Sequence, residues 1–120
     1  MLSLNYADVR EEESQDLSPV QTIMIIIVTE QASKWFEEEL DLEKGDGVRF
    51  FGKVYGKTEV HDNYSVAMQV AHPNDALALE TVNGITYFAE KIDEWFFSGY
   101  DFKIEYDEEM DEIKYRFLSN

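Results

Sequence analysis

Histidine chemistry in this chain rests on two residues, His61 and His72. His61 lies in a short polar stretch to which Glu59 and Asp62 add two carboxylates. Imidazole nitrogen and carboxylate oxygen are ligands for divalent iron or zinc, so His61, Asp62 and Glu59 form a candidate metal site. The alternative is an ordinary exposed loop histidine, because acids cluster easily in so acidic a chain. His72 precedes Pro73, which favours a structural turn residue.

Other catalytic and cofactor chemistry finds little support in the sequence. The chain has no cysteine, which excludes disulfides, thiolate zinc sites, cysteine nucleophiles and cysteine-ligated iron–sulfur clusters. No serine stands in a G-x-S-x-G motif, and the glycines form neither a phosphate loop nor a dinucleotide fingerprint. The acidic stretch 107–112 lacks the glycine of an EF-hand loop. We therefore expect no enzyme activity and no bound cofactor.

The charge balance limits the partners. The 120 residues include 26 Asp and Glu against 10 Lys and Arg, which gives a net charge of −16. Such a charge repels phosphate backbones, so we expect a protein partner and no nucleic acid. Arg49, Lys53 and Lys57 form a local positive stripe if they share the outer face of a strand, and this stripe either balances nearby glutamates or binds a partner. In solution we expect a monomer or a weak homodimer.

Composition indicates one domain preceded by a tail. Hydrophobic residues make up 44 % of the chain, enough for a core at this length. Residues 1–21 are polar, acidic and aperiodic, so we expect a mobile N-terminal tail before a domain of residues 22–120. One hypothesis is that the natural start is Met24. The longest apolar run, Ile23–Val28, is far too short to span a membrane, and no signal-peptide pattern precedes it, so we expect a cytoplasmic protein.

The spacing of apolar residues predicts the elements that hold these side chains. Residues 23–28 form a β-branched run typical of a buried strand. Thr29 is an expected N-cap, and the helix that follows should end near residue 42, before a glycine-rich turn. A short helix is predicted through residues 92–96, and further strands over 48–55, 64–70, 85–89, 100–106 and 113–117. His61 therefore falls on the loop between the second and third strands.

The resulting order, β-α-β-β-β-α-β-β, indicates an α+β fold dominated by mixed sheet. Its predicted core consists of the residues that face inward on these elements. They are Ile25, Ile27, Trp35, Phe36, Phe50, Val66, Met68, Tyr87, Trp95, Phe102 and Ile104.

Several segments together resemble a known family. Ile25–Leu40 and the following Gly47–Phe50 are similar to an opening strand, a helix capped by Thr-Glu and a strand containing G-x-R. Tyr64–Val70 resembles an aromatic-Ser strand, and Asn83–Glu90 resembles a Gly-Val-x-Val-Tyr strand. These features are those of the HesB/IscA-like family, the A-type iron–sulfur biogenesis proteins, and the likeness covers residues 24–118. It implies a HesB-like domain, a mixed β-sandwich or half-barrel with two short helices packed outside.

The cysteines that family members use for iron or a cluster are absent. Members place one cysteine before the aromatic-Ser strand, where this chain has His61, and a C-x-C near the C-terminus, where this chain ends at Asn120. The sequence is most similar to small cysteine-free HesB-like proteins of low-GC Gram-positive bacteria. The resemblance implies a non-enzymatic accessory or interaction protein related to iron–sulfur cluster or metal handling. The alternatives are weak iron or zinc binding through His61, or an acidic decoy for a basic partner.

Overall fold

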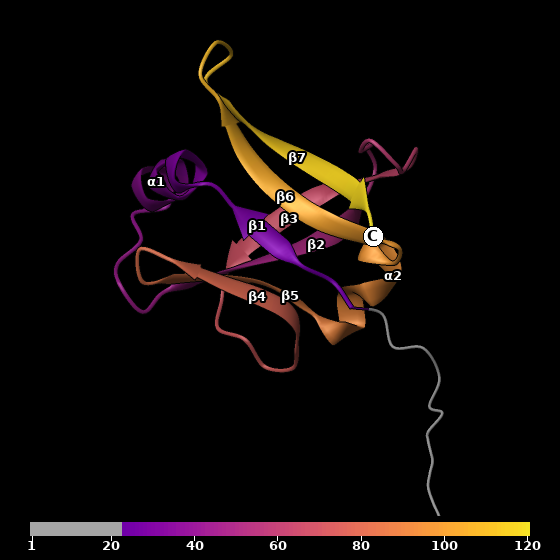
Figure 1. Cartoon of the computed structure of the whole chain (residues 1–120), viewed down its shortest axis with the longest axis horizontal. Helices are drawn as coiled ribbons and strands as arrows, with labels where there is room; N and C mark the ends of the chain where they lie inside the picture. Colours follow the sequence, from indigo (N-terminus) through magenta and orange to yellow (C-terminus); the bar gives the residue numbers. More distant parts are fainter. Residues whose placement is uncertain (1–22) are drawn as a thin grey trace, which may run out of the picture.

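The computed structural model describes residues 23–120, and the predicted tail of residues 1–21 lies outside them. The described residues form seven strands in two mixed sheets, two short α-helices and one 3-10 turn, which confirms the α+β class (Figure 1). In chain order the elements are β1 (Ile26–Val28), α1 (Glu30–Glu39), β2 (Gly47–Val54), β3 (Tyr64–Val70), β4 (Ala76–Val82), β5 (Ile85–Glu90), η1 (Lys91–Asp93), α2 (Glu94–Phe97), β6 (Tyr100–Asp107) and β7 (Glu112–Ser119).

The two sheets are each built around one parallel pair. The smaller sheet has the order β1-β6-β7, with β1 parallel to β6 and β7 antiparallel to it. The larger sheet has the order β3-β2-β5-β4, with β2 parallel to β5 and antiparallel partners at both edges. In Figure 1, β6 and β7 lie in front of β2 and β3, and the core fills the space between the two sheets.

Helix α1 begins where the sequence predicts. The Thr29 hydroxyl accepts a hydrogen bond from the Ala32 N–H at 3.2 Å, which satisfies one of the free donors of the first turn. The inner face of the helix buries Ala32 and Phe36 completely. The helix ends at Glu39, earlier than expected, because Asp41 adopts a left-handed φ of 52° that the helix cannot continue through.

Strand β4 is an addition that the sequence analysis did not predict. It runs antiparallel to β5 and joins it through Asn83 and Gly84, both with positive φ (55° and 81°). Such a pair is typical of a tight hairpin turn, because its backbone twist matches that of the strands. The ladder shifts register between Ala76 and Ala78, which makes β4 irregular at its start.

The core confirms much of the prediction but reverses the first strand. Phe36, Phe50, Tyr87, Phe102 and Ile104 are fully buried, as expected. Among the partly buried residues that pack against them are Trp35, Val66 and Met68. Ile25 and Ile27 were predicted to be buried and are instead exposed, whereas Met24, Ile26 and Val28 face the core. A run of consecutive β-branched residues has no alternation, so its phase cannot be read from the sequence.

The short helix α2 closes one end of the sandwich with Phe96 and Phe97, which are both buried. The predicted core residue Trp95 lies on the other side of the helix and is 55 % exposed. Phe96 sits directly over Gly52 of β2, where a Cβ would lie 2.4 Å from the ring. Gly52 is therefore required for close approach, while the ladder to β3 stays in regular register.

Candidate functional site

His61 supports the packing of the loop between β2 and β3. Its ring stacks on Phe96 with centroids 4.3 Å apart and an interplanar angle of 12°. Its Nδ1 is hydrogen-bonded to the Thr58 hydroxyl oxygen at 2.7 Å, and that oxygen also accepts from the His61 N–H at 3.0 Å. Both contacts hold the imidazole against the end of the core.

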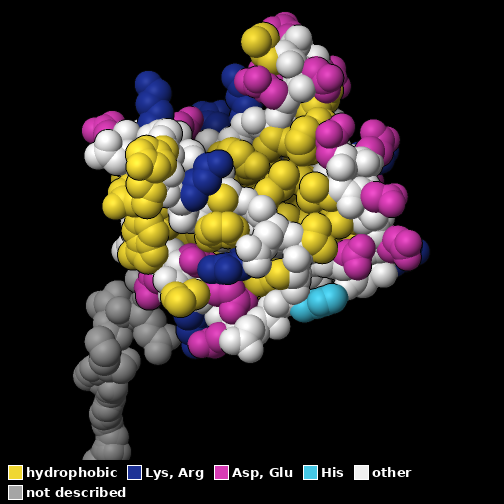
Figure 2. All heavy atoms as spheres, turned by 180° about the vertical axis from the view of Figure 1, so that it is seen from behind, with side chains coloured by type: hydrophobic (Ala, Val, Ile, Leu, Met, Phe, Trp, Pro, Cys, Tyr) yellow, Lys and Arg dark blue, Asp and Glu magenta, His cyan; other side chains and the backbone are white. Residues whose placement is uncertain are grey.

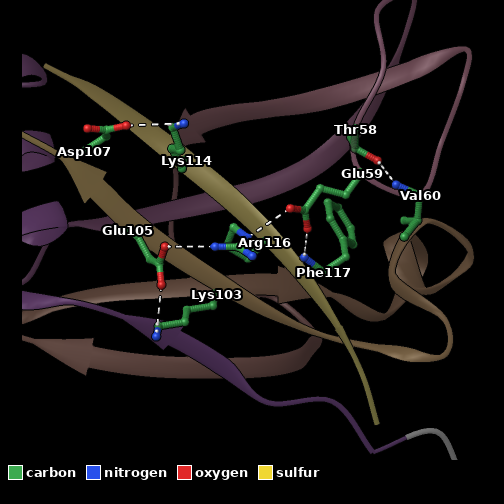
Figure 3. A network of polar contacts seen from close by, with 9 residues as sticks. All are labelled: Thr58, Glu59, Val60, Lys103, Glu105, Asp107, Lys114, Arg116 and Phe117. Carbon is green, nitrogen blue, oxygen red and sulfur yellow. Dashed lines mark hydrogen bonds and ion pairs between the residues drawn. The ribbon is translucent and has the colours of Figure 1, made fainter. Parts of the chain in front are cut away.

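Glu59 connects the same loop to β7 of the smaller sheet (Figure 3). One carboxylate oxygen accepts from Arg116 Nε and the other from the Phe117 N–H, each at 2.9 Å. Arg116 also reaches Glu105 on β6. Glu59 thereby caps a backbone donor on the outer edge of β7, a role that links positions 58 residues apart.

The residues of the hypothesised metal site are therefore not brought together as ligands. Glu59 faces Arg116, His61 faces Phe96, and Asp62 is exposed to solvent. Residues 23–120 contain no group of three or more His, Cys, Asp or Glu side chains that could hold a metal ion. The other histidine, His72, bonds through Nε2 to the Gly45 carbonyl at 3.1 Å, as befits a turn residue.

Of the three residues of the predicted basic stripe, Arg49 forms an ion pair within the fold. Its Nε and Nη2 both donate to the carboxylate of Asp93, at 2.8–3.0 Å, and Asp93 is buried at 6 % exposure. The guanidinium also lies over the Phe51 ring, 4.7 Å from its centroid. This pair ties β2 to η1, whereas Lys53 and Lys57 are exposed.

A buried hydroxyl cluster joins α1 to β5. Ser33 Oγ donates to Glu37 at 2.9 Å and lies 2.8 Å from the Tyr87 hydroxyl, which is the donor of that pair. Burial raises the pKa of Tyr87, so its phenol stays protonated. Ser33 has no histidine beside it to act as a base, and we interpret the cluster as a structural link.

An open groove of about 370 Å³ lies between α1 and the hairpin of β6 and β7. Its walls include Trp35 and Glu38 from the helix and Tyr106 and Asp111 from the hairpin. The Tyr106 hydroxyl donates a hydrogen bond to the Asp111 carboxylate, which raises the pKa of Tyr106 to about 12. The groove thus combines two aromatic side chains with carboxylates and one lysine, Lys34.

Exposed apolar side chains are the main feature that sequence reasoning missed. Hydrophobic side chains gather across the middle of the face seen in Figure 2, with carboxylates along its right edge and top. Large exposed apolar residues of the described chain include Val70 on β3, Leu79 on β4 and Trp95 on α2. The hydrophobic alternation of β3 was read correctly, but one sequence does not show which strand lies at a sheet edge.

These observations define the class of the protein as a small two-sheet α+β domain with polar clusters that support its own fold. No helix in residues 23–120 is long and apolar enough to span a membrane. No family model matches the chain, and no solved structure matches it.

The relatives of the chain are bacterial. The chain belongs to the family of the Bacillus subtilis protein named pyruvate dehydrogenase inhibitor, with 38 % identity over 89 residues, which cover 74 % of this chain and 94 % of the relative. An uncharacterized protein of Staphylococcus saprophyticus is 30 % identical over 95 residues, covering 77 % of this chain and 97 % of the relative. One from Staphylococcus haemolyticus is 29 % identical over 96 residues, covering 77 % and 96 %.

The comparison corrects the functional expectation. The resemblance to the HesB/IscA-like family implied an accessory protein related to iron–sulfur cluster or metal handling. The name of the Bacillus subtilis relative describes inhibition of pyruvate dehydrogenase, which is neither of these roles. The prediction failed because it transferred a function with a resemblance in strand and helix order, although the ligands of that function were missing from the sequence.

Proposed function

We propose that this chain is a non-enzymatic protein that inhibits pyruvate dehydrogenase by binding to it. The observation that carries the proposal is the 38 % identity to the Bacillus subtilis pyruvate dehydrogenase inhibitor over 94 % of that protein. The role requires a protein partner and the cytoplasmic location that the sequence predicts.

The described surface supports a binding role. The buried polar clusters, Arg49–Asp93 and Ser33–Tyr87, connect elements of the fold to one another. Hydrophobic side chains gather on the face seen in Figure 2, and a contiguous apolar patch of this kind marks sites of protein contact. The net charge of −16 favours rapid association with a positively charged partner surface.

We also propose that the fold is of the HesB/IscA type, without the metal-handling function of that family. Support comes from the two mixed sheets, the opening strand and capped helix, and the two short helices. An experimental structure of the chain, superposed on HesB-like domains, tests this fold assignment independently of any function.

The test of inhibition uses pyruvate dehydrogenase complex purified from the organism of this chain. The initial rate of pyruvate-dependent NADH formation is measured while the concentration of the full chain is raised. We expect the rate to fall along a saturable curve that reaches its limit when the binding sites are filled. An unchanged rate at concentrations far above that of the enzyme would overturn the proposal.

Two controls separate specific inhibition from an effect of charge. An unrelated protein of similar size and net charge, added at the same concentrations, should leave the rate unchanged. Raising the salt concentration should weaken inhibition without abolishing it, because apolar contacts are not screened. If the unrelated acidic protein inhibits equally well, the chain acts as a general polyanion, and the specific proposal is wrong.

A further inference from the structure

The sheet edges of this fold differ in how they are protected. A free strand edge offers unpaired backbone N–H and C=O groups to other chains, and proteins usually blunt it by shortness, charge, proline, bulges or covering groups. Strand β1 has three residues, and the Glu80 carboxylate accepts from its Val28 N–H at 2.7 Å. Strand β4 supplies that Glu80 and carries the register shift near Ala78.

Strand β7 is protected by charge and by a cap. Its outward side chains include Glu112, Lys114 and Arg116, and the latter two make ion pairs with acids of the same molecule. On its free edge, the Phe117 N–H is already bonded to Glu59. Three of the four edge strands in residues 23–120 therefore carry protection against pairing with another chain.

Strand β3 carries none of these devices. Its sequence, YSVAMQV, contains no charged residue and no proline, in a chain of which 30 % is charged. It pairs with β2 on one side only and without a bulge. None of its seven residues is fully buried, and Val70 is 54 % exposed. β3 is thus a seven-residue edge strand without charge, proline or bulge.

The register identifies the backbone groups that face outward on β3. The Ala71 N–H donates to the Gly47 carbonyl, and the Tyr55 N–H donates to the Asn63 carbonyl, just beyond the two ends of the β2–β3 ladder. Hydrogen-bonded and non-hydrogen-bonded pairs alternate in an antiparallel ladder. Counting inward from both ends, Val66 and Met68 fall in non-hydrogen-bonded pairs, so their N–H and C=O groups point to the free edge.

The same residues face the interior with their side chains. Val66 and Met68 lie opposite Gly52 and Phe50, and Phe50 is fully buried between the sheets. A strand added beside β3 would therefore place every second side chain on the same face of the sheet as Val66 and Met68, which pack against the core. β3 lies on the side of the molecule that Figure 2 shows, where hydrophobic side chains gather.

We propose that the free edge of β3 is the docking surface for an extended segment of pyruvate dehydrogenase, which adds to the larger sheet as a fifth strand. The inference rests on the proposed function, since that function names the partner. Backbone hydrogen bonds to Val66 and Met68 supply affinity, and alternate apolar side chains of the segment pack beside the Val66 and Met68 side chains. The segment is expected to carry basic residues beside its apolar ones.

Net charge favours the segment of pyruvate dehydrogenase over a second copy of the chain. Two copies would each bring a net charge of −16, which opposes their approach at low salt. A segment with lysine or arginine is attracted by the same field.

The main test compares two equally exposed positions on the two edges of the larger sheet. Val70 on β3 and Leu79 on β4 are both 54 % exposed, so Val70→Lys and Leu79→Lys make the same change in charge and hydrophobicity. Binding of each variant to immobilised pyruvate dehydrogenase complex is measured alongside the rate of NADH formation. We expect Val70→Lys to weaken binding and inhibition by about tenfold or more, because it places a charge on the docking edge, and we expect Leu79→Lys to behave as wild type.

A second pair tests the backbone contact itself. Val66→Pro removes an N–H that points outward and leaves the bonds to β2 in place, which an edge strand tolerates. Val66→Ala keeps that N–H and is the control. We expect the proline variant to bind more weakly than the alanine variant, and their thermal midpoints identify any loss due to unfolding.

The outcomes separate this inference from the proposed function. If the wild-type chain does not inhibit, the proposed function fails. If it inhibits and folded Val70→Lys inhibits equally well, the docking surface is elsewhere and this inference is wrong. Light scattering tests whether a second copy of the chain pairs with this edge instead. If wild type is a dimer, Val70→Lys is a monomer and inhibition is unchanged, the edge belongs to a second copy and the proposal is wrong.

Discussion

The contact between Gly52 and Phe96 predicts that a single methyl group on β2 destabilises the domain. In Gly52→Ala the new Cβ would lie 2.4 Å from the nearest ring carbon of Phe96, about 1 Å inside normal van der Waals contact. The ring cannot move away easily, because Phe96 is 1 % exposed and His61 stacks on it at 4.3 Å.

The magnitude follows from two opposing effects. Overpacking of this kind costs about 1–3 kcal/mol. Alanine recovers about 0.5–1 kcal/mol relative to glycine, because it restricts the unfolded chain. Because three ring carbons of Phe96 lie within 2.8 Å of the new Cβ, the cost falls in the upper part of its range, and we expect a net loss of about 1.5–2.5 kcal/mol in the free energy of unfolding. Each kcal/mol lowers the thermal midpoint of a domain of this size by about 4–8 °C.

Urea unfolding of the full chain measures this loss, and a double-variant cycle identifies its cause. If the clash with the ring is responsible, Gly52→Ala costs little in a Phe96→Ala background, because the space is then empty. The reasoning is refuted if Gly52→Ala leaves the free energy of unfolding unchanged at an unchanged denaturant slope, or if its cost is the same in both backgrounds.

Three further predictions concern charged and phenolic groups. Asp93→Asn should lower the free energy of unfolding, measured by urea unfolding, by about 3 kcal/mol, because it leaves the Arg49 guanidinium without its charged partner. A smaller loss in the double variant with Arg49→Met would confirm the pairing. Neighbouring Lys103 and Arg116 lower the pKa of Glu105 below its ordinary 4.5, so the ionised carboxylate stabilises the folded state above that pH. In a series of thermal midpoints, the advantage of wild type over Glu105→Gln should therefore disappear as the pH falls through the lowered pKa. Asp111→Asn should bring the pKa of Tyr106 down from about 12 toward 10.0, as measured by the ultraviolet absorbance of the phenolate.

Local signals in the sequence predicted most of the elements correctly. Thr29 capped its helix as expected because an N-cap needs only a hydroxyl and the N–H three residues later. Strand β3 matched its predicted range, Tyr64–Val70, because its apolar residues alternate without interruption. Strand β4 was missed because its alanine, leucine and glutamate residues have low strand propensity, and its pairing with β5 decides its conformation.

The roles of the candidate site residues could not be read from the sequence, because their contacts are distant along the chain. Glu59 and His61 looked like neighbouring ligands, yet Glu59 reaches Arg116 and His61 packs on Phe96. The unprotected edge of β3 was hidden for the same reason. A strand becomes an edge only through the order of the whole sheet, which a single sequence does not display.

The parallel pairing of β1 with β6 has a consequence for how this chain is made. Ile26 lies opposite Phe102, so the first strand has no strand to pair with until residues 100–107 have left the ribosome. Contacts of such sequence separation slow folding, because a long loop must close before they form. The apolar run Ile23–Val28 therefore lacks its strand partner, and is open to chaperones and to other nascent chains, until β6 has been made. Docking of β1 onto β6 therefore comes after the synthesis of all the elements between them and cannot guide how those elements fold.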